Sequence, residues 1–136
     1  MTPQPDLWGE IGTGQIKSPV AILREQAALL GSKTQNLVEA RVETSTFRDT
    51  FHHEFVLFVP ALDYKYQLFK VSHGVDMYPI ETTRLVAPVV SDAHHTAWPG
   101  YLLLNDEEEF VQWLHEKLSS PETKKIIANL LAQVAN

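Results

Sequence analysis

FHHEFVLFVPALDYKYQLFKVSH, residues 51 to 73, is the stretch on which the rest of this chain is organised. Two runs rich in β-branched and aromatic residues flank a turn at Pro60–Asp63. Such runs fit a pleated, half-buried surface better than a helix. The stretch therefore predicts a β-hairpin onto which the other elements pack.

The pairing register of this hairpin sorts its side chains into two faces. A turn centred on Leu62 and Asp63 places Val59 opposite Tyr66 and gives one strongly apolar face for the core. The other face is also fairly apolar, so it needs either a covering layer or a partner. The partner surface expected on that second face consists of Val56, Phe58, Phe69 and Val71.

A small-ligand pocket between the helices and the sheet is an alternative, and Trp98, Tyr101 and Trp113 could line it.

Length, charge and composition limit the functions open to the chain. Its 136 residues suit one domain, expected at residues 18–136, preceded by an extended or flexible arm at residues 1–17. A net charge of -6 disfavours nucleic-acid binding, and the lack of cysteine excludes disulfides and thiol chemistry. No apolar run reaches the roughly 20 residues that span a bilayer, so no membrane contact and a cytoplasmic location are expected.

Helix signals lie on both sides of the hairpin. Ser18 and Pro19 begin an amphipathic segment that Gly31 can end, and Asn105 is placed to cap a second helix. Ser120 and Pro121 repeat the first cap before a third helix. These signals predict an α+β fold. It consists of an antiparallel β-meander of about four strands, with an N-terminal helix and two C-terminal helices packed on one face.

The strands beyond the hairpin are less clearly marked. A half-exposed strand is expected over residues 37–43, followed by a loop or hairpin connection at residues 44–50 rather than continued pairing. A third meander strand is expected over residues 75–80, and a further edge strand over residues 85–90.

The histidines supply the strongest candidates for chemistry. In the register above, His52 lies opposite His73, where the two could hold a metal with a nearby carboxylate. A second candidate is the loop that carries Asp92, His94 and His95. Zinc usually takes three or four convergent ligands, so solvated strand ends and a solvated loop are the competing explanations.

The sequence thus favours a binding protein over an enzyme. The main expectation is a non-catalytic protein-binding or adaptor module without a cofactor, homodimeric through the sheet or bound to a protein partner. One alternative is a small metal-assisted hydrolase that uses the clustered histidines. The other is a small-ligand-binding domain. No residue is assigned a catalytic role.

Overall fold

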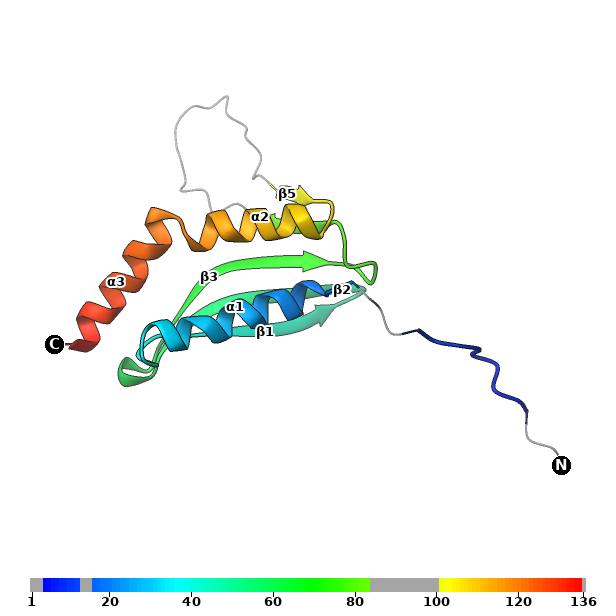
Figure 1. Ribbon diagram of the computed structural model, residues 1–136, viewed down its shortest axis with the longest axis horizontal. Coiled ribbons are helices and arrows are strands. Elements are labelled where there is room, and N and C mark those ends of the chain that lie inside the picture. The colour runs from blue at the N-terminus through cyan, green and yellow to red at the C-terminus, as the bar shows by residue number, and fades with distance from the viewer. Residues whose placement is uncertain (1–3, 13–15, 84–100, 136) are drawn as a thin grey trace, which may run out of the picture.

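A five-stranded antiparallel sheet with α-helices on one face forms the body of the protein (Figure 1). The computed structural model describes residues 4–12, 16–83 and 101–135. In this part of the chain the strands lie in the sheet in the order of the sequence: β1 (Glu39–Phe47), β2 (Thr50–Val59), β3 (Tyr64–His73), β4 (Ile80–Thr83) and β5 (Tyr101–Leu104). The helices are α1 (Pro19–Lys33), α2 (Glu107–Leu118) and α3 (Pro121–Ala135), and a short 3-10 turn, η1 (Pro60–Leu62), joins β2 to β3.

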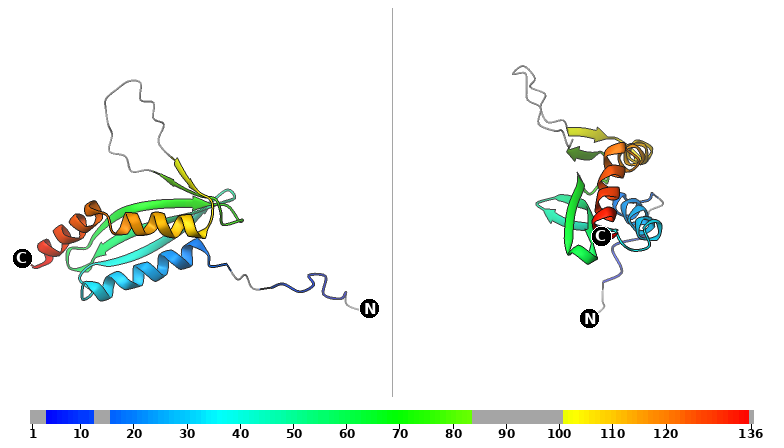
Figure 2. Two further views of the ribbon diagram at one scale, coloured as in Figure 1. Left: turned by 45° about the horizontal axis from the view of Figure 1, so that its top comes forward. Right: turned by 90° about the vertical axis from the view of Figure 1, so that its left-hand side faces the viewer.

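The predicted α+β class and meander are confirmed, with five strands in place of about four. Figure 2 shows that α1 covers the sheet near β1 and β2, whereas α2 lies toward β4 and β5. Of the described helices, none is long and apolar enough to cross a membrane.

Local capping signals set where the helices begin. The Ser18 hydroxyl accepts a hydrogen bond from the Ala21 N–H (3.2 Å), and Pro19 occupies the first helical position, as predicted. Helix α1 continues past Gly31 to Lys33, because Thr34 closes it through bonds to the Leu30 and Gly31 carbonyls. The predicted end at Gly31 is therefore wrong by two residues.

The cap of α2 lies one residue later than predicted. Asp106 accepts from the Glu109 N–H (2.8 Å), and the Glu109 carboxylate accepts from the Asn105 N–H (2.8 Å). Asp106 therefore replaces Asn105 as the capping residue, in a reciprocal arrangement of the kind expected. Ser120 accepts from the Thr123 N–H (3.2 Å) and so caps α3 as predicted.

Two strand predictions need correction. Residues 44–50 do form a hairpin connection, but pairing continues through most of them: they are the end of β1, a tight turn and the start of β2, with Phe47 paired to Thr50. Arg48 adopts φ 57° in this turn, which lets the two strands reverse without a loop. The strand expected over residues 75–80 is an irregular connection, and pairing begins only at Ile80, after Pro79, which has no N–H to donate. The strand expected over residues 85–90 lies outside the described residues.

A β-bulge in β3 changes the register of the central hairpin. Val56 pairs with Gln67 and Phe55 pairs with Phe69, so Leu68 is an extra residue between them. Leu68 and Phe69 are consecutive, yet both are buried in the core on the helix-covered face. The register deduced from the sequence, with Val59 opposite Tyr66, is wrong for a second reason as well: the turn is shorter than expected, so that Val59 lies opposite Tyr64.

The bulge and the shorter turn give the two faces of the sheet opposite characters. The helix-covered face carries the buried core, which includes Phe69 (2% exposed) and Val71 (1% exposed). The uncovered face carries charged side chains of β1, of which Arg41 lies 3.9 Å from the centre of the Phe58 ring. Lys65 Nζ lies 3.2 Å from a Glu43 carboxylate oxygen on the same sheet. The expectation that the second face is broadly apolar is wrong.

Candidate functional site

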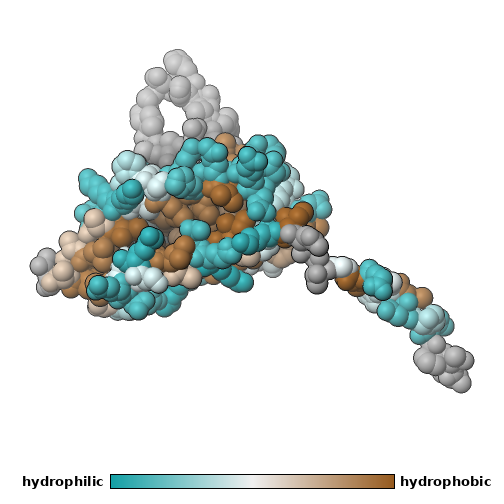
Figure 3. Space-filling model, viewed as in Figure 1, coloured by the Kyte–Doolittle hydropathy of each residue, from teal (hydrophilic) through white to brown (hydrophobic). Residues whose placement is uncertain are grey.

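An apolar groove runs over the middle of the sheet, between α1 and the region where α2 meets α3. Figure 3 shows hydrophobic side chains gathered in this gap between more hydrophilic helix surfaces. The groove contains a hollow of about 130 Å³. Its lining comes from five elements: Gln26, Leu29, Leu30 and Lys33 of α1, Phe55 and Leu57 of β2, Leu68 of β3, Leu118 of α2, and Thr123 and Ile127 of α3.

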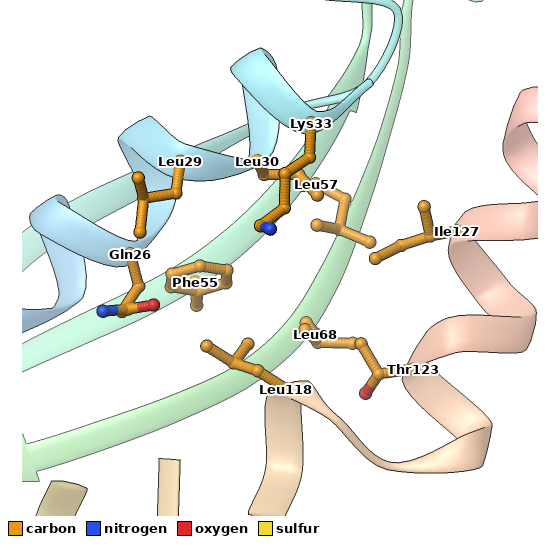
Figure 4. Close-up of a pocket in the computed structure, with 10 residues that line it drawn as sticks. All are labelled: Gln26, Leu29, Leu30, Lys33, Phe55, Leu57, Leu68, Leu118, Thr123 and Ile127. Atoms are coloured by element: carbon orange, nitrogen blue, oxygen red, sulfur yellow. The ribbon is translucent and has the colours of Figure 1, made fainter. Parts of the chain in front are cut away.

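The sheet supplies the floor of the groove. Phe55, Leu57 and Leu68 lie below the gap (Figure 4), and each is no more than 2% exposed, so these side chains are packed against their neighbours and present little surface to the hollow. The bulge is what brings Leu68 to this floor, because it adds one apolar side chain on the helix-covered side. The floor is therefore preformed, and its shape depends on the core.

The rim supplied by α1 is different in character. Leu29 is a large apolar side chain, yet it is 49% exposed. Burial of Leu29 would require α1 to rotate about its axis, and the helix would then lose contacts that its buried face makes with the sheet. Figure 4 shows that Gln26 and Lys33 extend from α1 toward the gap above Phe55. Within the described residues, no carboxylate forms an ion pair with the Lys33 ammonium group. The groove thus offers an apolar hollow with one amide and one unpaired cation at its edge.

A second cluster lies farther along the same hairpin, where two histidines face each other. His53 Nε2 and His73 Nε2 are 2.9 Å apart, and the two residues are 2% and 8% exposed. Phe51 stacks on the His73 ring at 5.5 Å between centroids. His73 therefore contacts His53, not His52 as predicted, and its partner across the strands is Phe51.

The hydrogen bonds of this cluster fix which nitrogen of each ring carries its proton. His73 Nδ1 lies 2.7 Å from the Gly74 carbonyl oxygen, which only accepts, so Nδ1 is the donor and Nε2 of the same neutral ring is the acceptor. His53 must then donate from Nε2, and its Nδ1 accepts from the Thr44 hydroxyl at 2.9 Å. The chain of bonds runs from Thr44 through both rings to Gly74.

Burial favours the neutral form of His53. The pKa of His53 is lowered from 6.5 to about 4, chiefly by burial and further by the electrostatic effect of the neighbouring His73, Arg24 and His52. In the hydrogen-bond arrangement above, each ring uses its ring-nitrogen lone pair as an acceptor within the protein, so neither has one left for a metal ion. In the described ranges, no group of three or more His, Cys, Asp or Glu side chains converges as a metal site.

The structure separates the other residues expected at a site. His52 lies beside Ser72 on the uncovered face, and its Nδ1 is buried without a hydrogen-bond partner. Asp92, His94, His95 and Trp98 lie outside the described residues, as does the side chain of Tyr101. Trp113 belongs to the core, where it meets Phe69 edge to face at 5.1 Å and stacks on Phe110 at 6.2 Å.

The expected partner surface is divided between the two faces of the sheet. Phe69 and Val71 lie under the helices, whereas Val56 and Phe58 lie on the uncovered side. The bulge is the reason, since it removes the strict alternation on which the prediction depended. A role for Val56 and Phe58 in binding stays a prediction.

Sequence reasoning missed most of the groove, because its lining is distributed over elements far apart in the chain. One signal was available at α1, where Leu29 adds an apolar residue beside the stripe that includes Leu23, Ala27 and Leu30. No protein-family model matches the chain, and no curated protein or solved structure is significantly similar to it.

Proposed function

We propose that this protein is a non-catalytic protein-binding module whose groove takes an apolar side chain and a neighbouring carboxylate from a partner segment. The observation that supports the proposal is the hollow over Phe55, Leu57 and Leu68 beside Lys33, whose ammonium group has no ion-pair partner in the part of the chain that the structure describes. Burial of an apolar side chain there gains free energy from the hydrophobic effect, and the ammonium group selects a partner with an acidic residue.

The size of the hollow favours a protein segment over a small-molecule ligand. Pockets for drug-sized ligands usually enclose about 300–1,000 Å³, whereas a cavity of about 150 Å³ holds a molecule the size of benzene. The hollow of about 130 Å³ is therefore suited to one side chain. An anchor of one side chain with polar contacts around it is how a peptide binds a groove.

The metal-assisted hydrolase is the weaker proposal on these grounds. Its pair of His52 and His73 is not formed, and the pair that is formed has its lone pairs in use. A homodimer and a cytoplasmic location stay predictions from the sequence.

The test uses two blocked tripeptides, each acetylated and amidated, one of aspartate followed by two leucines and the other of lysine followed by two leucines. We expect the aspartate peptide to shift backbone amide signals of the groove residues in ¹H–¹⁵N NMR spectra, and the lysine peptide to do so more weakly. Lys33→Glu should reverse this preference, whereas Lys125→Glu, an exposed charge reversal on α3, should leave it unchanged.

Leu29→Glu provides the apolar test and Val111→Glu its matched control. Both positions are half-exposed apolar residues on helix surfaces (49% and 44%), but only Leu29 lines the groove. We expect Leu29→Glu to abolish the shifts and Val111→Glu to preserve them. Equal effects of the two variants, or shifts spread over the whole surface, would contradict the proposal.

A further inference from the structure

The N-terminal arm carries the kind of sequence that the groove is suited to bind. In residues 4–12, Leu7, Trp8 and Ile11 are 82%, 80% and 71% exposed. Asp6 and Glu10 lie among them, and Asp6 accepts a hydrogen bond from the Trp8 N–H (2.9 Å). Three large apolar side chains so close together on a surface indicate an interaction segment, because scattered single residues are the normal case.

The arm and the groove are complementary in hydrophobicity and in charge. The arm offers apolar side chains where the groove offers an apolar hollow, and it offers carboxylates where the groove rim has the Lys33 ammonium group. In a complex, one apolar side chain of the arm would fill the hollow, and Trp8 would cover the exposed rim at Leu29. The whole chain carries a net charge of -6, so an exposed cation beside an apolar floor is a specific feature for an acidic segment to meet.

We infer that the arm of one copy binds in the groove of a second copy, so that two chains exchange arms in a symmetric dimer. This inference rests on the proposed function of the groove. The arm leaves the body at the start of α1 and runs away from it (Figure 1), whereas the groove is lined by the C-terminal half of α1. The arm thus points away from its own groove, as an exchanged segment does.

The exchange has the size of a weak, reversible dimer. A buried Trp contributes about 150–250 Å², so two arms that each bury Trp8 and one further apolar side chain bury several hundred Å², which is at the low end for specific interfaces, roughly 1,200 Å² or less. Because each copy supplies one arm and one groove, the interface closes with two chains and leaves no free end for further growth.

The first test measures mass by sedimentation velocity on the full chain over a range of concentrations. We expect a dimer that dissociates on dilution. The arm variant Leu7→Ser/Trp8→Ser and the groove variant Leu29→Glu/Lys33→Glu should each be monomeric. An equimolar mixture of the two should form a heterodimer through the single remaining arm and groove, at roughly 100-fold higher concentration than the unmodified chain requires. Val75→Ser, at a position 81% exposed outside the arm, should dimerise normally.

The second test uses the absence of cysteine from the chain. Gly12→Cys is placed in the arm, where an added side chain meets no atom within 4 Å, and Gln26→Cys is placed at the groove rim. When the two single variants are mixed and oxidised, a disulfide between them forms only if the arm of one chain reaches the groove of another. Gln112→Cys, exposed on α2 outside the groove, replaces Gln26→Cys as the control and should not cross-link above background.

The outcomes separate this inference from the proposed function. A chain that stays monomeric at every concentration while its groove still binds the aspartate tripeptide would overturn the arm exchange and leave the proposed function intact. Formation of an intramolecular disulfide in the double variant Gly12→Cys/Gln26→Cys, without dimers, would overturn the exchange in favour of the arm binding its own groove. A dimer that persists in both the arm and groove variants would also overturn it.

Discussion

The helix-covered face of the β2–β3 hairpin has two halves, both buried by the chain, that differ in the polarity of their side chains and in what lies over them. In the half near Gly74, the buried His53 and His73 have every ring nitrogen hydrogen-bonded within the protein. In the half near the groove, Phe55 and Leu57 lie beneath an open hollow. A buried polar atom without a hydrogen-bond partner lowers the free energy of unfolding by about 1–3 kcal/mol, so folding favours a hydrogen bond to each such atom within the chain. Apolar side chains need no such partner, so a hollow above them can remain open until another molecule binds.

The largest effect is expected from Leu57→Ala in the groove floor. Leu57 is 1% exposed, and truncation of a buried leucine costs about 2–5 kcal/mol from lost burial and the cavity that remains. Urea unfolding at neutral pH measures the loss. A cost near zero would mean that the groove floor is not part of the cooperative core, and the two halves would then differ in stability as well as in coverage.

Acidification should act on the polar half alone. Because the pKa of His53 is about 4 in the folded protein and 6.5 when unfolded, the unfolded chain binds a proton first as the pH falls. The free energy of unfolding should therefore fall between pH 6.5 and pH 4 by up to about 3 kcal/mol, and this contribution should be constant above that range.

His53→Phe isolates this contribution, because other groups also titrate in acid. Urea unfolding at a series of pH values should give a shallower slope between pH 6.5 and pH 4 for His53→Phe than for the unmodified chain. His115→Gln, on the exposed surface of α2, is the control and should keep the original slope. Parallel curves for all three proteins would show that His53 is not held neutral by its surroundings.

A smaller effect is expected when the hydrogen-bond chain is shortened at its end. Thr44→Val removes the hydroxyl that donates to His53 Nδ1 and leaves that nitrogen without its partner, at a cost of about 1 kcal/mol. Thr46→Val, two residues farther along the same face of β1, is the matched control and should change the free energy of unfolding by less than about 0.5 kcal/mol. Equal values for the two variants would contradict a stabilising hydrogen bond between Thr44 and His53.

The smallest effect is expected at the groove rim. Leu29→Ala should change the free energy of unfolding by less than about 0.5 kcal/mol, because Leu29 is half exposed and alanine favours the helix. The same exchange that is costly at Leu57 should thus be almost silent at Leu29, as expected of a residue whose contacts are made with an occupant. A cost as large as that of Leu57→Ala would place Leu29 in the core.

The parts of the fold that were predicted correctly depend on local signals. Ser18 with Pro19 and Ser120 with Pro121 cap helices through contacts within four residues, so the sequence contains all the information needed. The order of β1, β2 and β3 in the sheet also followed, because short connections between these strands leave a meander as the simplest arrangement.

The parts that were not predicted depend on contacts between distant elements. An extra residue in a strand is invisible when its neighbour is also apolar, and Leu68 and Phe69 are both apolar, so an unbroken ladder was assumed. Because of that assumption, His73 was predicted to face His52, whereas it contacts His53. The groove could not be deduced because its width depends on how far apart α1, α2 and α3 lie, which no periodicity within one helix reveals.

The bulge at Leu68 also determines where this protein tolerates a change in length. Without Leu68, Gln67 and Phe69 would follow each other and still face Val56 and Phe55, so the ladder would become regular and every other pair would keep its partner. Removal of one residue elsewhere in β3 would exchange the two faces of the strand beyond it. The bulge at residues 67–69 is thus the part of β3 where the hairpin can lose a residue and remain in phase, and removal of Leu68 in particular would take a side chain from the groove floor.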